Sequence, residues 1–387
     1  MNIKIFGCRF NKFCAQKWLN YLNKDDNYIL IASCAVTDNA KKKFIKEVKQ
    51  QIKNWKKIYL TWCGAFYENG KVDNNWFYDT YKCLSDYKQN ITLLPEFPEN
   101  TNINYFDKKL YTKWFVIVQS GCDNNCTFCI TTKKRWNHKN RKIKDVINDI
   151  NKLYSLWVKE IVLTWINLAS WWLKTTHDYP NDIFPIYLKD ILKNTDVPRI
   201  RISSIWPEFI TDNRFKIFEN KRILPYFHLS IQSWSDKILK LMWRHYNKKL
   251  ILDLLKNFYN LNKSVPVNIW ADIIVWFPWE TDNDFKQTLE IASYITKLHV
   301  FSFSGHKIWD TVPASVLPDK INQNKKDKRK ERLNIICSKN YEKLVNNTKW
   351  KKVNVLIEDN NKWRTDNYLK FECKRKIPKW EIIEVIF

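Results

Sequence analysis

The sequence predicts an α/β protein in three parts: an N-terminal α/β domain (1–100), a partial parallel (β/α) barrel (107–340) and a small C-terminal β-barrel (345–387). Two observations lead to this expectation. As far as about residue 330, short apolar runs alternate with segments of helix length, which is typical of parallel sheets. The tail instead shows short stretches of β alternation separated by turn residues, which is typical of a small barrel.

The N-terminal part contains three apolar runs of strand length, each of which leads into a cysteine. These runs are MNIKIFGC, YILIASCAVT and KKIYLTWCGA, and Lys-rich segments of helix length lie between them. Open α/β sheets build their sites at the carboxyl ends of their strands. We therefore expect Cys8, Cys34 and Cys63 to be delivered to such an edge.

The central part contains six apolar runs joined by segments long enough for helices. They are WFVIVQS, EIVLTWI, PRIRISSI, FHLSIQS, NIWADIIVWF and HVFSFS. Repeated strand and helix units of this kind predict a parallel, barrel-like βα fold. The charged segment DKINQNKKDKRKERLNIICSKNYEKLV follows and is expected to be a helix with a solvated Lys and Arg face, with a nucleic-acid contact as the alternative.

Length and charge limit the class of protein. A chain of 387 residues can bury a core without disulfides, and it has no uninterrupted apolar run of about 18 residues and no secretory leader pattern. We expect a cytoplasmic protein with no membrane partner, in which ten cysteines favour metal or cluster ligands over bridges. The net charge of +26 indicates a polyanionic partner, or else a coding bias toward Lys.

The most specific motif is Cys122-x3-Cys126-x2-Cys129 in QSGCDNNCTFCI. Zinc sites usually take four ligands from two separated pairs. Three closely spaced thiolates can instead hold three irons of a 4Fe-4S cluster and leave the fourth iron open. This spacing, with Phe128 before the last cysteine, is typical of radical SAM enzymes, and a zinc knuckle is the alternative.

With the N-terminal cysteines in GCRFN, SCAVT and TWCGA, the chain resembles the radical SAM methylthiotransferases over nearly its whole length. It is most similar to the type that acts on N6-threonylcarbamoyladenosine in tRNA, through GCRFN, RIRISSI and IQSWSDKILKLMWRHY. The resemblance implies a second 4Fe-4S cluster on Cys8, Cys34 and Cys63, beside the catalytic cluster on Cys122, Cys126 and Cys129. Four further cysteines match no family ligand and are expected to be ordinary thiols: Cys14, Cys83, Cys337 and Cys373.

The resemblance also implies the reaction. S-adenosyl-L-methionine (SAM) on the open iron is cleaved to a 5′-deoxyadenosyl radical, which removes hydrogen from C2 of the modified adenosine next to the anticodon. The substrate radical then attacks sulfur on the second cluster, which another SAM has methylated beforehand, and this gives the 2-methylthio product. The implied partners are tRNA, an electron donor such as flavodoxin or ferredoxin, and a sulfur donor. Two alternatives stay open: an isopentenyladenosine-type enzyme, and a non-catalytic RNA-binding protein whose cysteines hold zinc.

SAM needs polar groups, and barrel strands supply them at their carboxyl ends. The candidates are Thr164, Asn167, Ser204, Gln232 and Asp272. Polar residues that only satisfy one another are the alternative. Lys134, Arg135, Arg141 and Arg244 could meet phosphate or the SAM carboxylate, or be solvated at the surface. The tail resembles a TRAM domain, a small RNA-binding barrel, whose phosphate-facing charge would come from Lys351, Lys352, Lys374, Arg375 and Lys376.

The glycine and tryptophan counts are anomalous. A chain of this length should hold on the order of 27 glycines at about 7% usage, yet it has 5 glycines and 20 tryptophans. Tryptophan stands where the family pattern has glycine, or where a turn favours it, at Trp62, Trp136, Trp165, Trp172, Trp234, Trp276, Trp279, Trp363 and Trp380. We hypothesise that the source reads UGA as glycine and that the sequence was translated with UGA as tryptophan. The alternative is a Trp-rich protein with aromatic platforms for bases.

Overall fold

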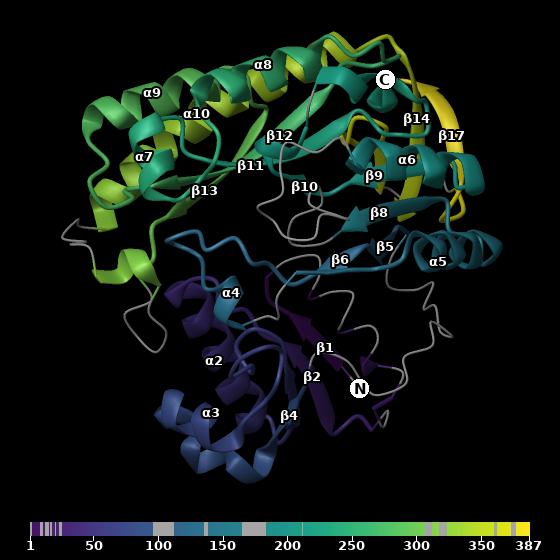
Figure 1. The fold of residues 1–387 in the computed structure, drawn as a ribbon. Coiled ribbons are helices and arrows are strands. Elements are labelled where there is room, and N and C mark those ends of the chain that lie inside the picture. The colour runs from purple at the N-terminus through teal and green to yellow at the C-terminus, as the bar shows by residue number, and fades with distance from the viewer. Residues whose placement is uncertain are drawn as a thin grey trace. The chain divides into compact units, whose positions relative to one another are not determined.

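The computed structural model describes residues 2–7, 25–95, 112–134, 138–164, 183–210, 212–305, 312–316, 323–359, 362–372 and 377–387, with residues 11, 15, 18, 19, 21 and 22 (Figure 1). The chain divides into two compact units. Unit 1 comprises residues 1–106, 120–139 and 304–317, and unit 2 comprises residues 107–119, 140–303 and 318–387. None of the described helices combines the length and apolar character needed to cross a membrane.

Unit 1 contains a four-stranded parallel sheet in the order β1-β2-β3-β4. Its strands are β1 (Asn2–Ile5), β2 (Tyr28–Ala32), β3 (Lys57–Thr61) and β4 (Ile91–Leu94), with helices α2 (Asp38–Lys53), α3 (Asn74–Thr80) and η1 (Lys82–Asn90) between them, and α4 (Thr131–Lys134) and η5 (Pro313–Val316) later in the chain. Helix α2 begins at Thr37, whose hydroxyl accepts from the Ala40 N–H at 3.1 Å. It buries Phe44 and Val48, four residues apart on one face.

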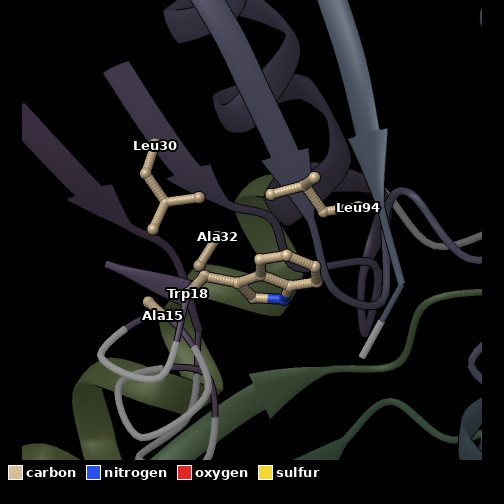
Figure 2. Close-up of a cluster of buried hydrophobic side chains, with 5 residues drawn as sticks. All are labelled: Ala15, Trp18, Leu30, Ala32 and Leu94. Atoms are coloured by element: carbon tan, nitrogen blue, oxygen red, sulfur yellow. The ribbon is translucent and has the colours of Figure 1, made fainter. Parts of the chain in front are cut away.

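One face of this sheet carries a cluster of buried apolar side chains (Figure 2). It contains Ala15, Trp18, Leu30, Ala32 and Leu94. The indole N–H of Trp18 donates to the backbone oxygen of Pro95 at 3.0 Å. A tryptophan in a native core usually has its indole N–H hydrogen-bonded, and Trp18 meets this requirement.

Unit 2 contains the six predicted strand regions, all parallel and adjacent in chain order. They are β5 (Trp114–Ile117), β8 (Glu160–Thr164), β9 (Arg199–Ile202) continuing into β10 (Ser204–Ile205), β11 (Tyr226–Gln232), β12 (Asn268–Val275) and β13 (Lys297–Ser302). The α/β fold with parallel βα repeats is therefore confirmed. Two short strands, β6 (Gln119–Ser120) and β7 (Lys139–Asn140), lie where the chain passes between the units.

Helices lie between these strands and after the last of them. They are α5 (Ile143–Ser155), α6 (Ile183–Asn194), η3 (Pro207–Phe209), η4 (Asp212–Glu219), α7 (Asp236–Leu241), α8 (Lys248–Tyr259), α9 (Asp282–Ala292) and the long α10 (Gln323–Thr348). The predicted charged helix is α10, and it packs on β13 and α9. Its residue Arg329 is buried and paired with Glu280 and Asp282, whereas Lys328 and Arg332 are exposed as expected.

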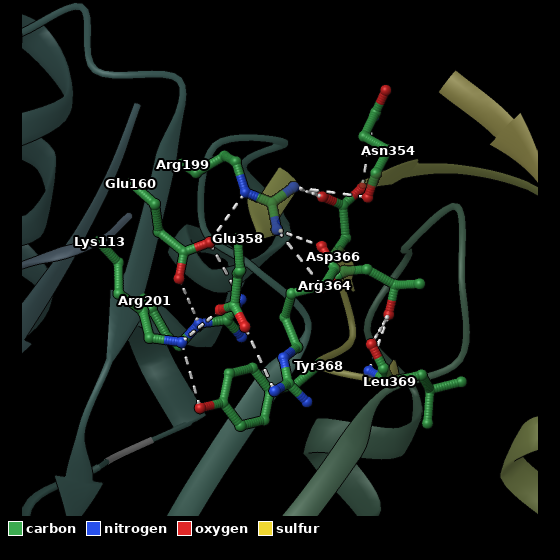
Figure 3. A network of polar contacts seen from close by, with 11 residues as sticks. Lys113, Glu160, Arg199, Arg201, Asn354, Glu358, Arg364, Asp366, Tyr368 and Leu369 are labelled. Carbon is green, nitrogen blue, oxygen red and sulfur yellow. Dashed lines mark hydrogen bonds and ion pairs between the residues drawn. The ribbon is translucent and has the colours of Figure 1, made fainter. Parts of the chain in front are cut away.

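The tail forms a four-stranded antiparallel sheet in the order β16-β15-β14-β17. Its strands are β14 (Lys352–Asp359), β15 (Lys362–Thr365), β16 (Lys370–Phe371) and β17 (Ile382–Ile386). A buried charge network joins this sheet to the starts of the barrel strands, and Figure 3 shows its members. Glu160 accepts from Arg199 Nε and Arg201 Nε, each at 2.9 Å, and Arg199 also pairs with Asp366 of the tail. Since a buried ion cannot be left unpaired cheaply, this network ties the tail sheet to the barrel.

Tryptophans dominate the strained backbone positions. Of the eleven described non-glycine residues with positive φ, eight are tryptophan: Trp55, Trp62, Trp157, Trp243, Trp276, Trp279, Trp350 and Trp380. Side chains with a β-carbon rarely adopt this conformation, and bulky ones almost never do, whereas glycine adopts it freely. The backbone therefore has glycine geometry at eight tryptophan positions, which supports the recoding hypothesis.

Three of these tryptophans close helices in the same way. At the end of α2, the Trp55 N–H donates to Ile52 O at 2.9 Å and the Lys56 N–H donates to Gln51 O at 3.0 Å. This pair of bonds is the Schellman motif, whose left-handed residue is usually glycine. The same two bonds close α5 at Trp157 and α7 at Trp243.

The remaining positions at which glycine was expected do not show a positive φ or lie outside the described residues. Trp234 and Trp363 are buried and have no positive φ, and Trp363 lies within strand β15, so the turn expected there is wrong. The indole N–H groups of both residues are buried and meet no acceptor among the described residues. Trp136, Trp165 and Trp172 lie outside the described residues.

Candidate functional site

The N-terminal cysteines lie at the carboxyl edge of the parallel sheet of unit 1. Cys34 follows β2 and Cys63 follows β3, in each case two residues beyond the strand, and both thiols are buried. Cys8 lies outside the described residues. Strands β1, β2 and β3 are neighbours in the sheet, so their carboxyl ends lie at one edge.

Close backbone packing brings the cysteine loops together. Gly7 has φ +96°, and a β-carbon at this position would lie 2.9 Å from Cys34 Sγ, so only glycine fits here. The hydroxyl of Ser33 donates to Thr61 O at 2.7 Å and accepts from the Gly64 N–H at 3.1 Å. Ser33 therefore holds the segment before Cys34 against the loop that carries Cys63.

The three-cysteine run is compact. Cys122 and Cys126 are buried and Cys129 is partly buried. Burial raises the pKa of the Cys122 thiol, and the neighbouring Cys129 and Cys126 thiols raise it further, because the three sulfurs are close enough to disfavour one another's charge. A site that crowds three thiols in this way is suited to a cation, which stabilises their thiolate forms. The donor set fits three irons of a 4Fe-4S cluster.

A buried lysine connects the two cysteine loops within unit 1. Lys134 ends helix α4, five residues after Cys129, and its ammonium donates to Phe66 O at 3.1 Å and Tyr67 O at 3.2 Å. The Gly70 N–H in turn donates to Lys134 O at 3.0 Å. The segment that follows Cys63 is thus bonded to the helix that follows the three-cysteine run.

The predicted SAM-binding residues have different surroundings. Thr164 is buried at the end of β8, and Asn167 lies outside the described residues. Gln232 ends β11 with φ +67°, and its side-chain amide makes no hydrogen bond to any residue in the described part of the chain. Strained backbone of this kind is concentrated at functional sites, which makes Gln232 the strongest of the set.

Ser204 and Asp272 are brought together by a histidine that the sequence did not single out. Ser204 Oγ lies 3.0 Å from His228 Nδ1, and His228 Nε2 lies 3.0 Å from Asp272 Oδ1. The same Asp272 oxygen lies 3.2 Å from His299 Nδ1. Burial alone would raise the pKa of Asp272, but the charges and hydrogen bonds of His228 and His299 outweigh it, so the pKa is held below its ordinary range.

The described basic residues proposed to meet phosphate or SAM make hydrogen bonds within the protein. Surface solvation is wrong for Lys134 and Arg244, which are buried. Arg244 donates to Ser230 O at 2.8 Å and to the Tyr246 hydroxyl at 2.9 Å. Arg141 donates to Ile117 O, and Arg135 lies outside the described residues.

In the tail, Lys351 and Lys352 are exposed, whereas residues 374–376 lie outside the described residues. Among the cysteines expected to be ordinary thiols, Cys337 is buried and Cys83 is exposed. Cys14 and Cys373 are not described.

Known proteins resemble this chain in sequence. Residues 116–292 match the radical SAM superfamily. A Rickettsia prowazekii protein named threonylcarbamoyladenosine tRNA methylthiotransferase MtaB is 30% identical, over 100% of this chain and 93% of its own length. A Thermotoga maritima protein of the same name is 31% identical, over 88% and 81%. The tRNA-2-methylthio-N(6)-dimethylallyladenosine synthase of Staphylococcus haemolyticus is 29% identical, over 93% and 75%.

A solved structure resembles the chain in fold. It is the radical S-adenosylmethionine methyltransferase TsrM from Kitasatospora setae with cobalamin and a [4Fe-4S] cluster bound, with a TM-score of 0.52 and 8% identity, covering 80% of this chain and 69% of that one. The full-length similarity to the Rickettsia protein decides the family. The chain belongs to the radical SAM methylthiotransferases.

Proposed function

We propose that the chain converts N6-threonylcarbamoyladenosine, next to the anticodon of tRNA, to its 2-methylthio derivative. The observation that carries this proposal is the occurrence of both cysteine sets in one compact unit, with α4 bonded through Lys134 to the segment after Cys63. A methylthiotransferase needs a SAM-cleaving centre and a sulfur-donating centre within reach of the same base. Relatives named for this substrate match the chain over most of its length.

The residues that would hold the two centres follow from this arrangement. Cys122, Cys126 and Cys129 would hold the catalytic 4Fe-4S cluster, and Cys34, Cys63 and Cys8 the second cluster. When bound, the clusters and SAM supply one-electron cleavage of SAM and sulfur for transfer. Gly7 leaves room beside Cys34, and Ser33 and Lys134 fix the loops that carry the ligands.

Thr164 and Gln232 are the proposed polar contacts for SAM, because they lie at strand ends, and Asn167 joins them from the sequence pattern. Ser204 and Asp272 are already bonded to His228. The antiparallel tail sheet, with exposed Lys351 and Lys352, fits a TRAM-like RNA-binding domain. A flavodoxin or ferredoxin as reductant, a separate sulfur donor and a cytoplasmic location complete the proposal.

Two other functions remain to be tested. A dimethylallyladenosine substrate is suggested by relatives with that name. An RNA-binding protein with zinc on its cysteines would need no SAM. The first alternative differs from the proposal in the modified adenosine that reacts. The second differs in the bound metal, zinc in place of 4Fe-4S clusters, and in the absence of SAM cleavage.

The test uses a glycine form of the full chain. In this form glycine replaces the eight tryptophans of positive φ and the four others that match family glycines, twelve positions in all: 55, 62, 136, 157, 165, 172, 234, 243, 276, 279, 350 and 380. After anaerobic reconstitution we expect two 4Fe-4S clusters per chain, and SAM cleavage under reductant. Tight zinc without cluster absorbance would overturn the proposal.

Cysteine variants separate the two centres. Cys122→Ala should abolish SAM cleavage and product together. Cys63→Ala should retain SAM cleavage but lose the methylthio product, because only the sulfur-donating centre is damaged. Cys83→Ala is the matched control and should keep both, since Cys83 is an exposed thiol outside either set.

A further inference from the structure

Four polar side chains form a continuous hydrogen-bonded chain across neighbouring strands of unit 2. Ser204, His228, Asp272 and His299 come from β10, β11, β12 and β13 respectively, one from each strand. Ser204 pairs with His228 in the sheet register, and Asp272 pairs with His299. Asp272 lies two residues beyond Trp270, the register partner of His228, so the four side chains share one face of the parallel sheet. We call them the Ser-His-Asp-His chain.

The hydrogen bonds of the Ser-His-Asp-His chain can all be made without a bound cation. An ionised Asp272 can only accept, so the His228 Nε2–H and the His299 Nδ1–H both donate to its Oδ1. The Ser204 hydroxyl then donates to the remaining nitrogen of a neutral His228, Nδ1. Every donor then has an acceptor, and Asp272 is ionised. Because the Nδ1–H of His299 donates to Asp272, the opposite nitrogen of the neutral ring, Nε2, is a lone-pair acceptor.

The two ends of the Ser-His-Asp-His chain differ in their exposure to solvent. Ser204 and His228 are anchored, and the His228 side chain is 10% exposed. The His299 side chain is 37% exposed, and its Nε2 has no hydrogen-bond partner among the described residues. Phe301, on the same face of β13 two residues further on, is also exposed. A chain that only stabilised the fold would not need an oriented acceptor that is open to solvent.

We propose that His299, oriented by Asp272, reads the side group on N6 of the substrate adenosine by accepting a hydrogen bond at Nε2. The inference rests on the proposed function and names its specificity determinant. A threonylcarbamoyl group offers a carbamoyl N–H and a hydroxyl as donors, whereas a dimethylallyl group offers neither. His299 is thus a specificity residue, and Asp272 is a positioning residue that acts through it.

The test is binding and turnover with anticodon stem-loop RNA on the reconstituted glycine form. The RNA carries threonylcarbamoyladenosine, dimethylallyladenosine or unmodified adenosine at the same position. We expect the parent chain to bind the threonylcarbamoyl RNA most tightly. His299→Leu should weaken that binding about tenfold or more, since this is the scale of one lost hydrogen bond in a desolvated site, and should leave binding of the other two RNAs unchanged.

Two further variants separate specificity from structure. Asp272→Asn should weaken the same binding, because an asparagine amide can donate to the imidazole and reverse its tautomer. His299→Gln keeps an acceptor near the position of Nε2 and should recover most of the preference. SAM cleavage without RNA should not change in either His299 variant, and His245→Leu, at an exposed histidine, is the matched control.

The outcomes distinguish this inference from the proposed function. A parent chain that makes no methylthio product, or prefers the dimethylallyl RNA, contradicts the proposed function. A parent that prefers threonylcarbamoyl RNA while His299→Leu keeps the full preference overturns only the inference. Stoichiometric zinc or a non-cluster iron that is lost in His299→Leu would also overturn it, since His228, Asp272 and His299 would then be metal ligands.

Discussion

Replacing three exposed tryptophans with glycine should stabilise the protein. Trp55, Trp157 and Trp243 follow α2, α5 and α7 with φ of 59°, 70° and 56°. Their side chains are 92%, 67% and 56% exposed, so removing them gives up little buried area. A left-handed conformation costs a residue with a β-carbon about 1–2 kcal/mol, while glycine pays a smaller entropic cost on folding.

The net gain is therefore about 1 kcal/mol at each site and about 3 kcal/mol for the triple variant. The backbone cost alone, about 1 kcal/mol at each of the eight positive-φ tryptophans, adds up to about 8 kcal/mol before the buried area of Trp62 is counted, which is within the whole stability range of about 5–15 kcal/mol for a folded domain. A chain made with tryptophan at every one of these positions should thus be barely stable.

Urea unfolding followed by circular dichroism measures this effect. The triple variant should unfold at a higher urea concentration than the parent chain. The control is Trp114→Gly, which removes a buried side chain from β5 where φ is not positive, and it should destabilise the protein by about 3 kcal/mol or more. An unchanged or lower midpoint for the triple variant would refute the backbone argument.

Mass spectrometry of the native protein tests the recoding hypothesis independently. A peptide spanning residues 271–286 should carry glycine at 276 and 279, where φ is 59° and 65°. Tryptophan in that peptide would refute the hypothesis. The strained backbone at the eight tryptophans of positive φ would then need a functional explanation.

Three other predictions follow from single side chains. Burial alone would raise the pKa of Glu160, but Arg201 and Arg199 outweigh it and hold the pKa below its ordinary 4.5, so its contribution to stability is present above pH 4.5 and falls as the pH drops below it. Glu160→Gln should cost about 3–5 kcal/mol at neutral pH and flatten the acid dependence of urea unfolding; an unchanged acid slope would contradict this. Lys134→Met should slow methylthio transfer more than SAM cleavage, in paired assays of the glycine form, and equal losses in both would argue against a role in joining the cysteine loops. Burial raises the pKa of Cys337 to about 11, so iodoacetamide should label exposed Cys83 and spare Cys337 in the folded protein, and rapid labelling of Cys337 would disprove its burial.

Much of the fold could be predicted because the strands have strong local patterns. The apolar runs that lead to Cys34 and Cys63 became β2 and β3, and the six central runs became the parallel strands of unit 2. The three-cysteine spacing pointed to its chemistry because the ligands are close in sequence. These signals depend only on neighbouring residues.

The contacts between distant segments could not be predicted. His228 and His299 lie on strands far apart in the chain, and only the sheet register places them beside Asp272. Lys134 was expected to meet phosphate or SAM or to be solvated, since nothing local shows that the carbonyls of residues 66 and 67 accept its hydrogen bonds. Trp363 lies in a strand because its pairing with Phe371 outweighs the turn-forming residues that follow it.

Nucleoside analysis of tRNA tests the central claim most directly. Transfer RNA that contains threonylcarbamoyladenosine is incubated with the reconstituted glycine form, SAM and reductant, then digested and separated by liquid chromatography with mass detection. We predict that threonylcarbamoyladenosine is consumed and its 2-methylthio derivative appears, and that neither change occurs with Cys63→Ala. A chain that carries both clusters and cleaves SAM, yet leaves threonylcarbamoyladenosine intact while modifying dimethylallyladenosine or nothing, would contradict the proposed function.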